Sequence, residues 1–190
     1  MPTSKLQHAL YAMITVFFTV HAYVFYSLYV VNGDVLMRVT NTSSVLDAIA
    51  AQGGVYMIGR FVPIWAVVLL EFVLAFTLEM VMGSPCSFRL AARLFHPKET
   101  HPVLFETAII SATAALMCPA MSLIAAFLYY PYYAGFDFLT LLANWLKLVC
   151  LNFPFALLGQ LFFIQPLVRT IFKSISRRTK KNTDHEQQAA

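Results

Sequence analysis

Three ionisable side chains lie within long apolar stretches of the sequence, and these residues are the first candidates for chemistry. They are His21, Glu71 and Lys147. A charged group at the centre of a bilayer costs about 3 kcal/mol on insertion scales, so each of them requires an explanation. We expect the three to converge with Asn144 as a polar site inside the membrane, where they would relay protons or bind a charged solute. The alternative is a static hydrogen bond or ion pair that holds helices together.

A second cluster, from Met117 to Met121, places a thiol and two thioethers around Pro119. Such soft ligands suit Cu(I). Because no second cysteine follows the proline, a helix kink at Pro119 with methionines filling gaps is the favoured interpretation. The three cysteines, Cys86, Cys118 and Cys150, show neither a disulfide framework nor zinc spacing. We expect no metal and no cofactor. Walker, GxGxxG, HExxH and GxSxG signatures are also missing, so we expect no catalytic residues and no enzyme.

The composition predicts a membrane protein rather than a water-soluble domain. Of the 190 residues, 59% are hydrophobic and 12% are charged, whereas soluble domains are about 25% charged. A membrane-spanning helix needs about 20 mainly apolar residues. Four stretches meet this requirement, which predicts an all-α integral membrane protein with four transmembrane helices. The predicted spans are Leu10 to Val31, Phe61 to Met82, Thr107 to Tyr130 and Phe138 to Ile164.

The distribution of basic residues predicts the orientation. With four spans, ten Lys and Arg residues fall on the side that holds both termini, and only Arg38 and Arg60 fall on the other. The positive-inside rule therefore places both termini in the cytoplasm. These basic residues are already explained by the inner membrane surface, so we expect no nucleic acid partner.

The order of spans and loops suggests two parallel helical hairpins produced by duplication. A shift of 80 residues aligns Trp65 with Trp145 and Arg89 with Arg169. The first unit would occupy residues 1–100, with an outer loop at 32–60 and an inner amphipathic segment at 85–95. The second unit would occupy 101–176, and a polar cytoplasmic tail 177–190. Within the outer loop, Ser44 and the glycines at 53 and 54 bound a predicted short helix.

Basic residues spaced about four apart follow each hairpin, which places them on one helical face. We expect such a face to contact anionic lipid headgroups of the inner leaflet, while the apolar face enters the lipid. The expected lipid contacts are Arg89, Arg93, Arg169, Lys173 and Arg177.

Three motifs in the second half carry a resemblance. They are Asn144-Trp145, the segment from Asn152 to Ala156 (NFPFA), and the segment from Pro166 to Arg169 (PLVR). Across residues 107–175 the chain resembles a small bacterial inner-membrane module of two helices that is known only as a domain of unknown function. The first half resembles it less, because only Trp65 and Arg89 remain. The resemblance implies a helical fold in the bacterial cytoplasmic membrane, and it implies no functional residue.

Two functions remain open. One is small-solute or proton-coupled transport, and the other is a non-catalytic accessory or assembly subunit of a membrane complex. Four helices are few for a solute path, so transport would require a homo-oligomer; alanines at 108, 112 and 115 would permit close helix contact. Charged residues that face an enclosed polar cavity would favour transport, whereas a dry, filled interior would favour the accessory role. In either case the lipid bilayer is the principal partner.

Overall fold

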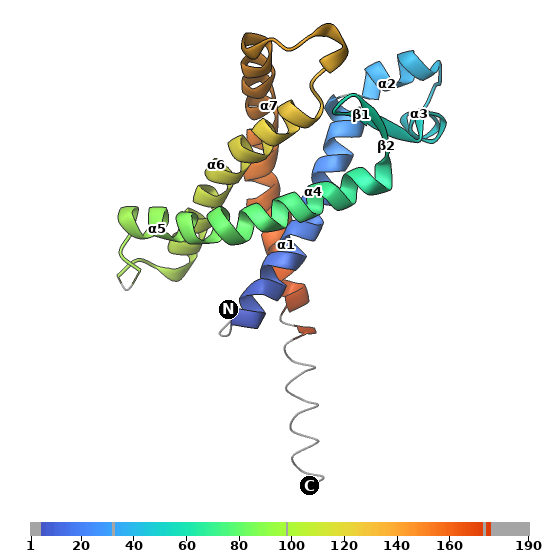
Figure 1. Ribbon diagram of the computed structural model, residues 1–190. Helices are drawn as coiled ribbons and strands as arrows, with labels where there is room; N and C mark the ends of the chain where they lie inside the picture. The colour runs from blue at the N-terminus through green and yellow to red at the C-terminus, as the bar shows by residue number, and fades with distance from the viewer. Residues whose placement is uncertain (1–4, 32, 98, 173, 176–190) are drawn as a thin grey trace.

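A computed structural model describes residues 5–31, 33–97, 99–172 and 174–175, and most of them are helical. Figure 1 shows long helices that cross one another, with a smaller group of short elements at one end. Within the described residues, four helices are long and apolar enough to cross a membrane, which confirms the predicted number. They cover Ala9–Val31, Ile64–Leu94, Pro102–Leu128 and Phe138–Phe172.

The first long helix consists of α1 (Lys5–Phe25) and a π-helical turn, η1 (Tyr26–Val31). The second consists of α4 (Ile64–Leu78), a π-helical turn, η2 (Glu79–Gly83), and α5 (Ser84–Leu94). The third is α6 (Pro102–Leu128). The fourth begins as α7 (Phe138–Gly159), passes through a π-helical turn, η4 (Gln160–Ile164), and continues helically through residue 172. A short 3₁₀ turn, η3 (Tyr132–Ala134), lies in the connection between α6 and α7.

The amphipathic segment predicted at 85–95 is helical, but it continues the second long helix rather than standing apart from it. The helix likewise runs on past Pro166. Both prolines directly follow the first residue after a π-helical turn. The ring of a proline normally clashes with the carbonyl group four residues earlier. The wider π turn relieves this crowding, so the helix passes each proline without ending.

The segment between the first two long helices contains more structure than the sequence predicted. The short helix expected after Ser44 is α3 (Val45–Gln52), and it ends at Gly53 in the left-handed conformation, with φ +66°. Ser44 takes the N-cap position but makes no side-chain capping bond. A further helix, α2 (Gly33–Thr40), precedes α3.

A β-hairpin follows α3 and changes the start of the second span. Strand β1 (Gly54–Met57) pairs antiparallel with β2 (Arg60–Pro63), with Val55 opposite Val62. The predicted span began at Phe61, but this residue belongs to β2 and the helix begins at Ile64. At the hairpin turn, the backbone N–H of Ile58 donates to the carbonyl oxygen of Leu128 at 2.8 Å. The hairpin is therefore fixed to the end of α6.

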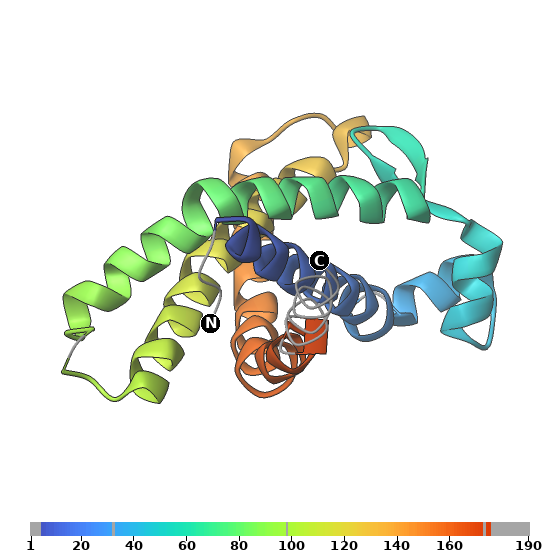
Figure 2. The same cartoon turned by 90° about the horizontal axis from the view of Figure 1, so that it is seen from below.

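Helix α1 packs against α4 through a cluster of Val16, Val20 and Ala75. Helix α6 packs against α7 through a second cluster, Ala126, Tyr130 and Leu141. The two views in Figures 1 and 2 show α5 beside the first part of α6. Each cluster contains one alanine, a residue small enough to permit close contact between helices.

The ends of the described chain meet at one end of the molecule. The rings of Tyr11 and Phe172 lie edge to face, with centroids 5.5 Å apart. The beginning of the first long helix and the end of the fourth thus lie together.

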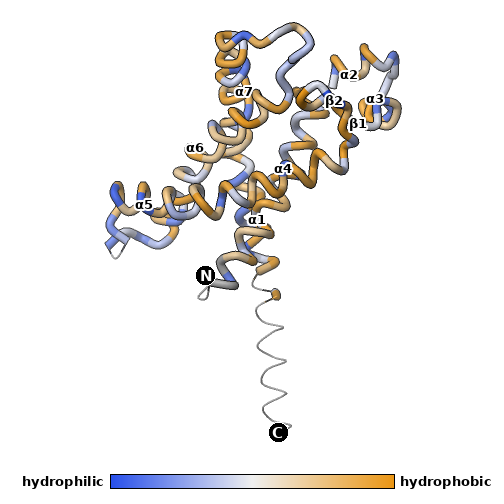
Figure 3. Tube along the Cα trace, in the orientation of Figure 1, coloured by the Kyte–Doolittle hydropathy of each residue, from blue (hydrophilic) through white to orange (hydrophobic). Residues whose placement is uncertain are grey.

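Most of the apolar surface of the long helices is not covered by the chain itself. Only 11% to 22% of the most apolar window of each span is buried. Figure 3 shows hydrophobic residues along all four long helices. In water such a surface would drive aggregation, so lipid or another chain must cover it.

Candidate functional site

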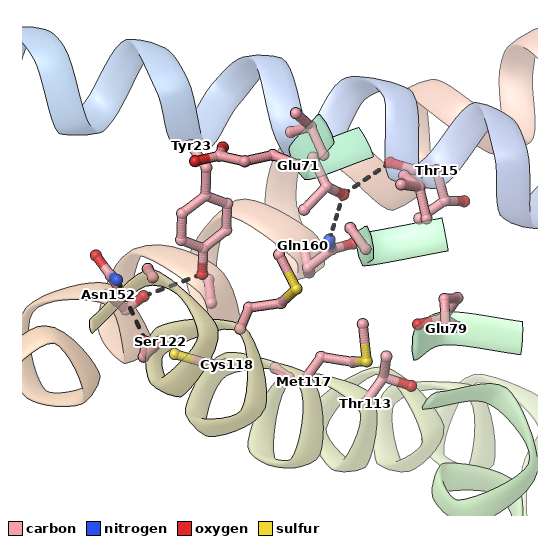
Figure 4. Close-up of a pocket in the computed structure, with 18 of the residues that line it drawn as sticks. Thr15, Tyr23, Glu71, Glu79, Thr113, Met117, Cys118, Ser122, Asn152 and Gln160 are labelled. Atoms are coloured by element: carbon pink, nitrogen blue, oxygen red, sulfur yellow. Dashed lines mark hydrogen bonds between the residues drawn. The ribbon is translucent and has the colours of Figure 1, made fainter. Parts of the chain in front are cut away.

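A cavity of about 1310 Å³ lies between the four long helices. Its wall is formed by residues of α1, α4, α6 and α7, with smaller contributions from the π-helical turns and from α5. Figure 4 shows its polar side chains between α1 on one side and α6 on the other. A cavity of this size exceeds the 300–1,000 Å³ of typical ligand pockets, so it has room for an organic solute.

Glu71 lies on α4 and lines this cavity. The hydroxyl group of Tyr129 donates a hydrogen bond to its carboxylate at 2.5 Å. Tyr129 directly follows α6, so the bond connects the second long helix to the end of the third. Asn144 and Lys147 of α7 line the same cavity. The structure thus brings three of the four predicted polar residues to one cavity.

His21 is not among the residues that line the cavity. Its side chain is exposed, and Nδ1 forms a hydrogen bond with the backbone carbonyl oxygen of Phe17 at 2.8 Å. On α1, the buried residues Val16 and Val20 line the cavity together with Thr15 and Thr19. His21 projects from a different face of α1, away from Glu71. The boundaries of a span do not specify how the helix is rotated about its axis, so the sequence did not predict this direction.

A second carboxylate, Glu79, also lines the cavity, although it was not among the predicted site residues. It follows Glu71 by eight residues, a spacing that puts both on neighbouring parts of one helix face. The hydroxyl group of Ser84 donates to Glu79 at 2.7 Å. A Cβ atom at Gly83 would lie 2.3 Å from Glu79 Oε2 and 3.0 Å from Met117 Sδ. The absence of a side chain at position 83 therefore leaves the space that the Glu79 carboxylate occupies.

A chain of hydrogen bonds crosses from the first to the fourth helix along the cavity wall. The Tyr11 hydroxyl donates to Gln165 Oε1 at 2.6 Å, and Gln165 Nε2 donates to Gln160 Oε1 at 3.4 Å. Gln160 Nε2 donates to the Thr19 hydroxyl at 2.8 Å. These residues were not predicted as a site, because single uncharged polar residues in apolar sequence give no signal of their partners.

A second link joins the first, third and fourth helices. The Tyr23 hydroxyl donates to the carbonyl oxygen of Asn152 at 3.3 Å. Asn152 Nδ2 donates to the buried Ser122 hydroxyl at 3.4 Å. Cys118, also buried, lies beside this link in Figure 4. The side chains of Tyr23, Asn152 and Ser122 are therefore joined across three helices.

The basic residues expected at lipid headgroups differ in their surroundings. Arg169 forms an ion pair with Glu106 at 2.9 Å, with side-chain exposures of 37% and 20%. Both residues line the cavity, as does the exposed Arg89. Arg93 is exposed. Of the remaining expected contacts, Lys173 and Arg177 lie outside the described residues.

The predicted kink residue, Pro119, lies within α6, which is continuous on both sides of it. The indole N–H of Trp145 donates to the carbonyl oxygen of Pro119 at 2.9 Å. This bond fixes α7 to α6 at mid-helix. It gives the tryptophan a structural role, which its position in the NW motif alone did not indicate.

Comparison with known proteins identifies a domain in the second half of the chain. Residues 105–176 match the family model DUF2798, which is described as a domain of unknown function. No curated protein and no solved structure matches the chain. The match confirms the resemblance to such a domain in the second half. It covers most of α6 and all of α7, whereas Glu71 and Glu79 lie outside it. The chain is thus a helical membrane protein with a domain of unknown function.

Proposed function

We propose that this chain is a proton-coupled transporter of small solutes in the bacterial cytoplasmic membrane, with Glu71 and Glu79 as the proton-carrying groups. One observation supports this most directly: the cavity among the membrane helices is lined by two carboxyl groups that have hydroxyl partners instead of cations. Within the described residues, the ion pair that forms is Arg169 with Glu106. Carboxyl groups without a fixed counter-ion can gain and lose protons as a solute enters and leaves.

The proposed orientation places both termini in the cytoplasm. The excess of Lys and Arg on the side that holds them supports it. The contact between Tyr11 and Phe172 agrees with an even number of crossings. In this orientation Arg89 and Arg93 lie at the inner leaflet, where anionic headgroups would attract them.

The chain is proposed to consist of two related helical hairpins. Turn η4 lies 81 residues after η2, close to the shift of 80 that aligns the tryptophans and arginines. Each turn also carries a side-chain hydrogen bond between residues five apart, Ser84 to Glu79 and Gln165 to Gln160. A shared irregularity with the same internal bond supports a common origin of the two halves.

The test is transport by purified protein in liposomes that contain the pH-sensitive dye pyranine. Four solutes, choline, tetraphenylphosphonium, glucose and lactate, are added separately to the outside. We expect at least one of them to drive proton movement in the wild-type protein. Glu71→Gln should abolish it, because the amide oxygen accepts the Tyr129 hydrogen bond but the amide does not gain or lose a proton. Glu99→Gln, at an exposed residue outside the cavity, should retain it.

A second variant keeps the test informative if Glu71→Gln fails to fold. Tyr129→Phe retains the carboxyl group and removes its donor, so we expect transport to persist with a shifted dependence on pH. Absence of proton movement with all four solutes, in folded wild-type protein, would overturn the proposal.

The alternative is an accessory subunit of a membrane complex. The large apolar surface left uncovered on all four spans favours it. Intact-mass analysis after purification in mild detergent distinguishes the two, because a stable heteromeric partner at fixed ratio is expected only for the accessory role.

A further inference from the structure

The wall of the cavity is mainly apolar and polarisable. Three methionines, Met80, Met117 and Met121, line it together with valines of α1 and α4. Thioether groups adapt to bulky apolar partners and contact aromatic rings favourably. A small polar solute would gain little from this wall. A solute with an aromatic or aliphatic body would bury that body against it.

The uncharged polar groups of the wall are largely occupied with one another. The Thr19–Gln160–Gln165–Tyr11 chain and the Tyr23–Asn152–Ser122 link use the amides and hydroxyls that a sugar would need. Replacing these bonds with bonds to a polar solute would give little net gain. This arrangement disfavours neutral polyhydroxy compounds as the solute.

The charges of the wall favour a cation. Arg169 and Glu106 neutralise each other at 2.9 Å. Lys147 and Arg89 have exposed side chains, whereas Glu71 and Glu79 are only partly exposed. The long, flexible stems of these two cations let their charged ends reach the membrane surfaces, whereas the two carboxylates have the hydroxyl donors Tyr129 and Ser84. An organic cation placed between Glu71 and Glu79 would supply a counter-charge to these carboxylates.

The spacing of the two carboxylates suits a bulky ion. Eight residues of α-helix separate their backbones by about 12 Å along the axis. One carboxylate can therefore hold the charge while the body of the ion lies along the wall toward the other. The aromatic ring of Tyr23 also lines the cavity and can add a cation–π contact.

From these observations we infer that the cavity binds lipophilic organic cations, monovalent ammonium or phosphonium ions with an aromatic or aliphatic body, with Glu71 and Glu79 as counter-charges. The inference that these ions are transported rests on the proposed function, whereas the inference that they bind in the cavity does not. On entry of the ion, a protonated carboxyl group releases its proton to water and the resulting carboxylate pairs with the cation. One positive charge enters and one leaves.

Protons and the cation would compete for the same two groups. The other titratable residues of the cavity wall also contribute to its field. They are Tyr11 and Tyr23 of α1, Arg89 of α5, Glu106 and Cys118 of α6, Tyr129 directly after α6, Lys147 of α7 and Arg169 of the fourth long helix.

The test compares two ions of nearly equal size and shape and opposite charge, tetraphenylphosphonium and tetraphenylborate. Binding to the purified full chain is measured by equilibrium dialysis in mild detergent, against a detergent blank. We expect saturable binding of tetraphenylphosphonium that weakens as the pH falls. Glu71→Gln with Glu79→Gln should weaken it by about tenfold or more. Glu99→Gln should leave it unchanged, because Glu99 does not line the cavity.

The result that would overturn the inference is equal or tighter binding of tetraphenylborate, or binding of tetraphenylphosphonium that is unchanged in the double variant. If the double variant does not fold, each single variant is measured, and an unchanged affinity in both has the same meaning. Failure here differs from failure of the proposed function. If only another solute drives proton movement, the transport proposal stands and the proposal of a lipophilic cation as the solute is refuted. If tetraphenylphosphonium binds specifically but no solute drives proton movement, only the transport proposal is refuted.

Discussion

At the scale of single residues, the carboxylates that line the cavity differ in the kind of partner they have. Glu106 has a guanidinium partner, Arg169, whereas Glu71 and Glu79 have the hydroxyl groups of Tyr129 and Ser84. An ion pair inside a helix bundle fixes its members. A hydroxyl group can serve a carboxyl in either protonation state, as donor or as acceptor. Glu71 and Glu79 are therefore suited to exchange, and Glu106 is suited to holding the third and fourth long helices together.

Asp137, directly before α7, gives a pH-dependent prediction outside the membrane spans. The hydroxyl group of Thr140 donates to its carboxylate at 2.5 Å, and the backbone N–H of Thr140 donates at 3.0 Å. These bonds hold the pKa of Asp137 below its usual value of about 3.9. Because the pKa is lower in the folded state, the stabilisation is present above the unfolded pKa and is lost as the pH falls through the folded one.

We expect Asp137→Asn to remove this dependence. The amide still accepts the capping bonds of the first turn, but it does not titrate. Thermal unfolding in detergent, followed from neutral to strongly acidic pH, should show the wild-type advantage disappear only at the acidic end. A constant difference between the two proteins over the whole range would contradict the prediction.

At the scale of elements, the π-helical turns determine what the long helices present to the cavity. Turn η2 begins with Glu79, and turn η4 begins with Gln160. Both residues line the cavity. A π turn holds more residues per turn than an α-helix, so the residues after it face differently from those of a regular helix. Such turns are frequent at functional sites. The turns thus bring polar side chains inward and let the helices continue past Pro85 and Pro166.

Alanine substitutions at two glycines should have opposite effects. Gly83→Ala should destabilise the protein by about 1 kcal/mol, at the low end of overpacking costs because the Glu79 carboxylate can move, and should break the bond to Ser84. Gly159→Ala should be neutral or stabilise by up to about 1 kcal/mol, because its Cβ would meet nothing within 4 Å and alanine favours the helix. Unfolding of both variants in the same detergent is the measurement. A stabilising Gly83→Ala would refute the close approach.

At the scale of the whole molecule, the chain leaves most of each span uncovered. At most 22% of the most apolar window of any span is buried. Large exposed side chains such as Trp65, Leu69 and Phe163 are between 57% and 73% exposed. Lipid covers such an apolar surface, so other parts of the chain need not pack against it. The fold therefore depends on a few close helix contacts and on the polar links across the cavity.

The two ends of the chain should lie in the same compartment. The hydrogen bond from Tyr11 to Gln165 and the ring contact between Tyr11 and Phe172 bring the beginning and end of the bundle together. Reporter fusions at the two ends, one active only in the cytoplasm and one only outside it, check this. We expect both ends to report the cytoplasm, and opposite reports would refute four crossings.

Composition and run length were sufficient to determine the membrane class and the four long helices. This works because hydrocarbon imposes a minimum apolar length on a helix, and that length is readable residue by residue. The helix after Ser44 was also readable, since glycine at position 53 marks its end. The start of the second span was not, because Phe61 is equally apolar in a strand and in a helix, and only its pairing with Tyr56 distinguishes the two.

Only the tertiary structure decided which polar residues share a cavity. Glu71, Asn144 and Lys147 do so, Glu79 joins them, and His21 does not. Depth in a membrane follows from position along a span, which the sequence states directly. Rotation about the helix axis depends on π-helical turns and on contacts with other helices, such as Trp145 with Pro119. Those contacts join residues far apart in the chain, so local sequence determined the depth of each group and long-range packing determined its direction.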